Sequence, residues 1–135
     1  MSIGIGGNAQ IVMQDEKTVG YAYAPYNLNV EAYRNPGRTY DGLILIDKSA
    51  LVEPVLHEKI KKCPSGRKQR VVTRIPRVVD YDALIAAGAV SVLNSKFCWK
   101  VLPNGVGSIA MRLLRRIFER YQASGELPES ISYHI

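Results

Sequence analysis

The segment IAMRLLRRIFERYQA, residues 109–123, decides the fold. Its apolar residues recur every three or four positions, and this spacing predicts an amphipathic helix with one buried face. Ser108 is a candidate N-cap, and Gly125 suits the position just past a helix end. The arginines of the segment fall on the side opposite to the apolar stripe. That stripe comprises Ile109, Ala110, Leu113, Leu114, Ile117, Phe118 and Tyr121.

The rest of the chain contains short strand patterns and two shorter helical ones. Pro54 suits the first position of a helix over residues 54–62, and Asp80 is a good N-cap for a helix over residues 81–87. The elements do not alternate strictly, so we expect an α+β fold: a single domain with a mainly antiparallel β-sheet, about three helices, and the long C-terminal helix packed on the sheet. Strands are predicted over residues 9–13, 18–24, 43–46, 68–75, 89–93 and 97–102, the last two as a hairpin.

The length of 135 residues fits one domain, spanning residues 1–135, with a core large enough to fold unaided. Residues 1–7 contain three glycines and nothing to anchor them, so we expect a flexible lead-in. Residues 126–135 follow the predicted end of the long helix and are expected to form a tail on the surface.

Composition limits the functional classes. The chain carries 18 Lys and Arg against 12 Asp and Glu, a net charge of +6, which favours polyanionic partners. Only two cysteines occur, Cys63 and Cys98, and this sparse usage favours a cytoplasmic protein. No apolar run approaches the length of about 20 residues that spans a bilayer, and the N-terminus lacks the features of a signal peptide, so no membrane partner is expected.

Basic residues are concentrated in residues 59–77, which contain eight Lys and Arg and no acid. Arg67 lies in the turn that precedes the predicted strand over residues 68–75. Lys68, Arg70 and Arg74 alternate along that strand, so they should share one face and form a row of cations suited to several phosphates. We also expect this face to contribute to the open side of the main sheet. The simpler interpretation is a solvated strand whose charges prevent aggregation at a sheet edge.

A second candidate anion site precedes the long helix. Gly105, Gly107 and Ser108 lie where backbone N–H groups and the helix dipole can hold an anion. Arg112 occupies the first turn, where a cation is locally unfavourable unless an anion binds there. The segment is not a phosphate-binding P-loop, because no Gly-Lys-Ser/Thr follows at the required spacing. An ordinary capped connection is the alternative interpretation.

Trp99 and the tyrosines are candidates for stacking on a nucleic-acid base. Packing in the core is the simpler explanation for aromatic residues. We expect no metal site, because the two histidines and two cysteines lack ligand spacing. No cofactor and no catalytic residue is predicted. Asp41 with Asp47, or His57 with Glu58, are the groups on which an enzyme would depend.

Three functional hypotheses follow. The first is non-enzymatic binding of a phosphate-bearing anionic ligand, either a nucleotide or a nucleic acid, through the basic turn and strand. The second is a protein–protein interaction module, either of an immunity or antitoxin kind or as an oligomeric accessory protein, and this includes association with a second copy of the chain. The third is a small hydrolase or nuclease. The sequence does not identify the ligand or the pathway.

Overall fold

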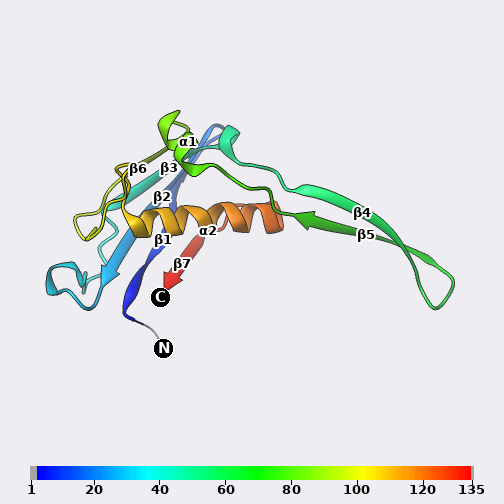
Figure 1. Cartoon of the computed structure of the whole chain (residues 1–135), viewed down its shortest axis with the longest axis horizontal. Coiled ribbons are helices and arrows are strands. Elements are labelled where there is room, and N and C mark those ends of the chain that lie inside the picture. Colours follow the sequence, from blue (N-terminus) through cyan, green and yellow to red (C-terminus); the bar gives the residue numbers. More distant parts are fainter. Residues whose placement is uncertain (1–2, 135) are drawn as a thin grey trace.

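The computed structural model describes residues 3–134 and consists of a sheet, a long helix and a projecting hairpin (Figure 1). Five strands form the main sheet, one face of which is covered by helix α2. The other two strands form a separate two-stranded sheet that extends away from this body. The strands are β1 (Ile5–Gln14), β2 (Thr18–Asn27), β3 (Gly42–Asp47), β4 (Val55–Lys62), β5 (Lys68–Ile75), β6 (Val90–Leu93) and β7 (Ser130–His134).

The expected α+β class with a mainly antiparallel sheet is confirmed, but the number of helices is smaller than predicted. Two α-helices occur among the described residues, α1 (Tyr81–Ala86) and α2 (Ser108–Ser124), instead of about three. Two single 3-10 turns accompany them, η1 (Glu31–Tyr33) and η2 (Lys48–Ala50). The main sheet has the order β6-β3-β2-β1-β7, and every neighbouring pair is antiparallel.

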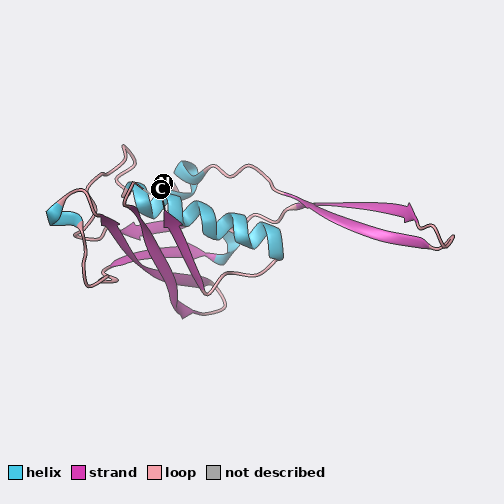
Figure 2. Cartoon of the chain, turned by 90° about the horizontal axis from the view of Figure 1, so that it is seen from below, coloured by secondary structure: helices cyan, strands magenta, loops and turns pink. Residues whose placement is uncertain are grey.

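Helix α2 packs across the sheet as its apolar stripe predicts (Figure 2). Leu113, Leu114, Ile117 and Phe118 are fully buried on its inner face. They meet the side chains that alternate along the strands, because every second residue of a strand points to the same face. The strand residues of this core include Val19, Tyr21 and Tyr23 of β2, Ile44 and Ile46 of β3, and Val90 of β6.

The predicted helix over residues 54–62 is wrong, since these residues form strand β4, which pairs with β5. The apolar stripe assigned to that helix buries nothing: Leu56 is 58% exposed and Ile60 is 70% exposed. A helix needs tertiary packing of such a stripe for most of its stability, and here backbone pairing with β5 replaces it. The strand predicted over residues 68–75 is confirmed as β5, but it does not join the main sheet.

Both chain ends contribute strands where loose segments were expected. β1 begins at Ile5, so the predicted lead-in over residues 1–7 is wrong for residues 5–7, while residues 1–2 lie outside the described part. Within the predicted tail over residues 126–135, Ser130–His134 forms the edge strand β7, paired with β1. Ile131 is buried in the core, and the alternation of serine with Ile131 and Tyr133 is the period-two pattern of a strand. Residue 135 is outside the described part.

The hairpin predicted over residues 89–102 is also wrong. β6 pairs with β3, which is distant in sequence, and residues 94–107 form an irregular connection with one isolated bridge between Val101 and Gly107. The short helix α1 is confirmed, and the Asp80 carboxylate accepts a hydrogen bond of 3.0 Å from the Ala83 N–H.

Candidate functional site

The most distinctive surface feature is the β4–β5 hairpin, hereafter the arm, defined as residues 55–75. Its register runs from Val55 opposite Ile75 at the root to Lys62 opposite Lys68 near the tip. Eight paired residues in each strand give a length of about 25 Å. Every residue of both strands is exposed, and Figures 1 and 2 show the arm standing clear of the body.

The arm accounts for the net charge of the whole protein. It contains seven of the 18 basic residues and one of the 12 acidic residues, so it carries +6. The remaining 11 basic and 11 acidic residues cancel, and the body is therefore formally neutral. The arm cations are Lys59, Lys61, Lys62, Arg67, Lys68, Arg70 and Arg74.

Both faces of the arm mix cations with aliphatic side chains. Residues directly opposite each other in an antiparallel pair lie on the same face. Lys68, Arg70 and Arg74 therefore share a face, as predicted, but this face belongs to the arm and not to the main sheet. That face carries Leu56, Glu58, Ile60 and Lys62 of β4 with Lys68, Arg70, Val72 and Arg74 of β5. The other carries Val55, His57, Lys59 and Lys61 with Gln69, Val71, Thr73 and Ile75.

Two of the predicted site cations have partners within the protein. Arg70 forms an ion pair with Glu58, and both side chains are more than half exposed, so the pair adds little stability. Arg74 lies at the root, where a Cβ added at Gly125 would come within 3.2 Å of its guanidinium. Gly125 ends α2, so Arg74 lies by the negative end of the helix dipole. Within residues 3–134, the remaining arm cations have no carboxylate partner. These are Lys59, Lys61, Lys62, Arg67 and Lys68.

The glycine loop before α2 uses its backbone N–H groups in hydrogen bonds within the protein. The N-cap is Gly107 and not Ser108, and no side chain caps the helix. A Cβ at Gly107 would lie 2.5 Å from the Cys98 sulfur, so the chain needs glycine there for close packing. Burial raises the pKa of the Cys98 thiol. The backbone N–H groups expected to hold an anion donate internally: Gly105 to the Leu102 carbonyl, Val106 to the Asn104 side chain, Gly107 to the Asn94 side chain and Ser108 to the Lys100 carbonyl.

The other two predicted site residues are separated from the arm. Arg112 lies near the start of α2, and its guanidinium carbon is 5.6 Å from the centre of the Tyr133 ring. Trp99 is partly buried against the core in the connection that precedes α2. The arm root lies by the opposite end of α2, at Gly125. The structure therefore groups four predicted site residues on the arm, namely Arg67, Lys68, Arg70 and Arg74. It does not bring Arg112 or Trp99 to them.

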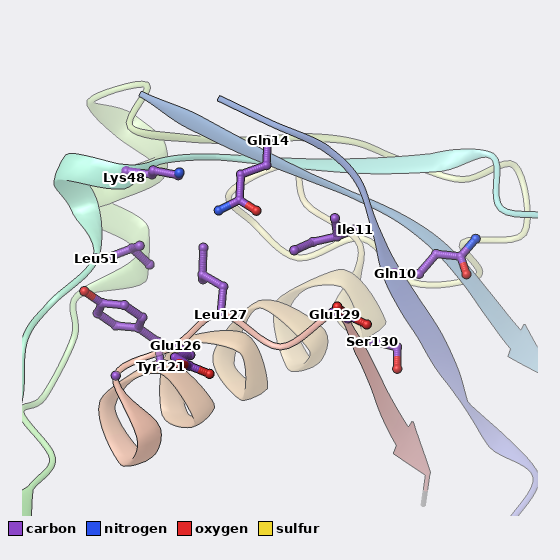
Figure 3. A pocket seen from close by; sticks show the side chains of 11 residues that line it. Gln10, Ile11, Gln14, Lys48, Leu51, Tyr121, Glu126, Leu127, Glu129 and Ser130 are labelled. Carbon is purple, nitrogen blue, oxygen red and sulfur yellow. The ribbon is translucent and has the colours of Figure 1, made fainter. Parts of the chain in front are cut away.

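A wide cavity that the sequence did not reveal lies between β1 and the end of α2 (Figure 3). It has a volume of about 840 Å³, and its polar lining includes Gln14, Lys48 and Glu126. On its wall, the Tyr121 hydroxyl donates a hydrogen bond to the Glu53 carboxylate, and this bond raises the pKa of Tyr121. Residues from three separate segments form the cavity, so no local pattern indicates it. The cavity is lined by both positively and negatively charged side chains, and no residue of the arm lines it.

The groups considered for catalysis are not assembled. The Asp41 carboxylate accepts hydrogen bonds from the Ser95 hydroxyl and from the Lys96 N–H, and so it fixes the connection after β6. His57 and Glu58 are adjacent in β4 and point to opposite faces of the arm. Among residues 3–134, no three His, Cys, Asp or Glu side chains are grouped so as to hold a metal ion.

Comparisons of the chain with protein-family models, with curated proteins and with solved structures find no match. Among the described residues, no helix combines the length and the apolar character needed to cross a membrane.

Proposed function

We propose that the chain binds nucleic acid without catalysing a reaction, and that the arm is the binding element. The observation that carries this proposal is the location of the entire formal net charge on one exposed, projecting hairpin. Lys and Arg side chains that neutralise phosphates release condensed counterions, and this release supplies most non-specific affinity for nucleic acid. The formally neutral body would add little to this electrostatic affinity.

A polymer suits the arm better than a free nucleotide. A nucleotide site is concave, with a few convergent polar groups that bury most of the ligand. The arm is instead an exposed stripe about 25 Å long, with cations on both faces. Successive phosphates of one backbone can contact such a stripe at several points, whereas a single nucleotide would contact one or two cations.

The arm is held to the body only at its root, which suits a projecting binding element. Pro54 and Pro76 flank it, and the Arg77 N–H donates a hydrogen bond of 2.6 Å to the Gln122 side chain on α2. These contacts fix where the arm begins but leave the tip and its cations accessible. Lys61, Lys62 and Lys68, near the tip, are the side chains expected to contribute most to binding.

Fluorescence anisotropy with a labelled random-sequence oligonucleotide tests the proposal. The triple variant Lys61→Gln/Lys62→Gln/Lys68→Gln should bind at least about tenfold more weakly than the wild-type chain at low salt, since it loses three phosphate contacts. The matched control is Lys17→Gln/Lys96→Gln/Lys100→Gln, which removes the same number of exposed lysines from the body. Equal losses in the two variants would mean that net charge matters and the arm does not.

A second candidate function, binding an acidic protein, is favoured by the aliphatic side chains of the arm. Leu56, Ile60 and Val72 share a face with Arg70 and are all at least half exposed. Apolar residues interleaved with arginine are typical of protein interfaces. Here Ile60→Thr should weaken binding more than Lys61→Gln does, and native mass spectrometry of the purified protein would reveal a co-purified partner or a second copy of the chain.

A further inference from the structure

We infer that the nucleic acid bound by the arm is double-helical DNA and that the arm enters its major groove. This inference rests on the proposed function and specifies its substrate. It draws on three properties of residues 55–75: the width of a two-stranded ribbon, the absence of aromatic residues, and the mixture of aliphatic and cationic side chains on each face.

The dimensions of the arm match one groove only. Two paired strands lie about 4.8 Å apart before their side chains are added. The major groove of B-form DNA is about 12 Å wide and accepts a two-stranded β-ribbon without deformation, whereas the minor groove, at about 6 Å, would have to widen to admit one. Because the arm stands clear of the body, the body does not block its approach to a groove.

The composition of the arm argues against single strands. Proteins that bind single-stranded nucleic acid stack the bases on aromatic side chains. Residues 55–75 contain no Phe, Tyr or Trp, and Trp99 is partly buried on the body. Arg70, whose guanidinium could also stack on a base, is paired with Glu58. The arm therefore offers charge without an aromatic surface on which successive unpaired bases can stack, and, among the described residues, Arg67 in the turn is its one guanidinium with neither an ion pair nor a contact at the root.

Double-stranded RNA is disfavoured by the shape of its grooves. The major groove of A-form RNA is deep and too narrow for side chains to read. Its minor groove is wide and shallow, and recognition there uses contacts to the 2′-hydroxyl groups. The arm would lie on such a surface without being enclosed, so its aliphatic side chains would stay exposed.

Phosphate binding alone would leave the aliphatic side chains of the arm without a function. The major groove of DNA offers them a contact. On each face, valine, leucine or isoleucine side chains lie among the lysines and arginines. On one face, for example, Val72 and Ile60 are diagonal neighbours across the two strands, and Arg70 lies next to both. In a major groove, the long cationic side chains reach outward to the phosphates. The shorter aliphatic side chains then contact the C5-methyl groups of thymine. Val72 and Ile60, which share one face of the arm, are the residues placed for these contacts.

A competition experiment with the full chain tests the inference. A labelled 20-base-pair DNA duplex of mixed sequence is bound, and unlabelled duplex DNA, single-stranded DNA, duplex RNA and poly-glutamate are added as competitors. We expect duplex DNA to compete at least tenfold better than any of the others. A duplex whose thymines carry bulky groups at C5, in the major groove, should bind at least tenfold more weakly, and a ligand that fills the minor groove should not displace the chain.

The outcomes separate this inference from the proposed function. Stronger binding to single strands or to duplex RNA, lost in the Lys61/Lys62/Lys68 glutamine variant, would overturn the inference and support the proposed function. Insensitivity to the C5 groups together with displacement by the minor-groove ligand would overturn major-groove entry. Equal competition by poly-glutamate would indicate a general polyanion site or an acidic protein partner. No binding to any nucleic acid at low salt would overturn both proposals.

Discussion

Single residues on β2 and β3 determine how these two strands pack against each other. Gly42 lies opposite Tyr23, and a Cβ added at Gly42 would be 2.2–2.6 Å from the atoms of the Tyr23 ring. The Tyr23 ring is fully buried, and its hydroxyl accepts a hydrogen bond of 3.0 Å from the Ser95 N–H. Position 42 therefore requires glycine, because a Cβ there would overlap the buried Tyr23 ring.

Gly42→Ala should lower the free energy of unfolding by about 1–3 kcal/mol, the usual cost of overpacking a core. The matched control is Gly37→Ala, since the nearest atom to a Cβ at Gly37 is 4.0 Å away. Urea denaturation of both variants provides the measurement. If the two variants were equally stable, the contact between position 42 and the Tyr23 ring would not exist in solution.

The buried tyrosines predict a loss of stability at alkaline pH. Burial raises the pKa of Tyr23 to about 12 and raises that of Tyr21 as well, from the ordinary value of 10.0. Below pH 10, each tyrosine makes its full contribution to the free energy of unfolding. Above pH 10 the unfolded chain loses a proton that the folded chain keeps, so each tyrosine lowers the free energy of unfolding by about 1.4 kcal/mol per pH unit. For Tyr23 this loss ends near pH 12.

Urea midpoints between pH 8 and pH 11.5 test this dependence. Tyr23→Phe should be less stable than the wild-type chain at pH 8 by about 1 kcal/mol, because the Ser95 N–H loses its acceptor. Above pH 10 its stability should decline less steeply, because one of the titrating groups is gone. Parallel declines in the two proteins would show that the Tyr23 hydroxyl is not buried.

At the scale of elements, the strand β2 and the helix α2 were predictable because each has a clear period and its own buried face, and β3 was predictable because residues 43–46 are an uninterrupted apolar run. β4 was not. Leu56 and Ile60 are four residues apart, and the lysines at its end suit a helix C-terminus, so the local pattern favours a helix. The competing interaction is pairing with β5 through the turn at Gly66, whose φ of +81° suits glycine. This pairing depends on a second segment of the chain, so the spacing of apolar residues within β4 alone does not indicate it.

The candidate site was predictable in only some of its residues, and not in its position. Lys61 and Lys62 suited the end of a helix and were not predicted as site residues. The excess of cations in residues 59–77 is a property of composition, so the sequence alone identifies Arg67, Lys68 and Arg70. Their projection from the body depends on β4 and β5 making no hydrogen bonds to the main sheet. The N–H groups of residues 105–108, at the predicted anion site before α2, have internal acceptors for a related reason. The acceptors that occupy its N–H groups, such as the Asn94 side chain and the Lys100 carbonyl, lie several residues away.

Because the arm contributes no side chain to the core, its removal should leave the body folded. We expect a chain with residues 55–75 replaced by a short Gly-Ser linker to keep its far-ultraviolet circular dichroism of helix and sheet, and to unfold cooperatively within about 5 °C of the wild-type chain. The interactions between the root and the body, chiefly that of Arg74 near Gly125, are exposed and contribute little stability. An unfolded or molten product would show that the arm is structural.

At the scale of the whole molecule, the protein divides its roles between two parts. The body has a buried core, no formal net charge and hydrogen bonds between segments distant in sequence, such as the 2.6 Å bond from the Tyr21 hydroxyl to the Pro128 carbonyl. The arm has no core and all of the net charge. A two-stranded hairpin is at best marginally stable alone in water, so a bound partner that covers the arm would also order it.

The most direct test of the account is the salt dependence of binding to random-sequence duplex DNA, measured for the wild-type chain and for the Lys61→Gln/Lys62→Gln/Lys68→Gln variant. If the five arm cations without a carboxylate partner contact phosphates, a plot of log K against log salt concentration should have a slope of about −4 to −5, and about −2 for the variant. Equal slopes for the two proteins, or binding that does not change with salt, would contradict the claim that the arm binds nucleic acid.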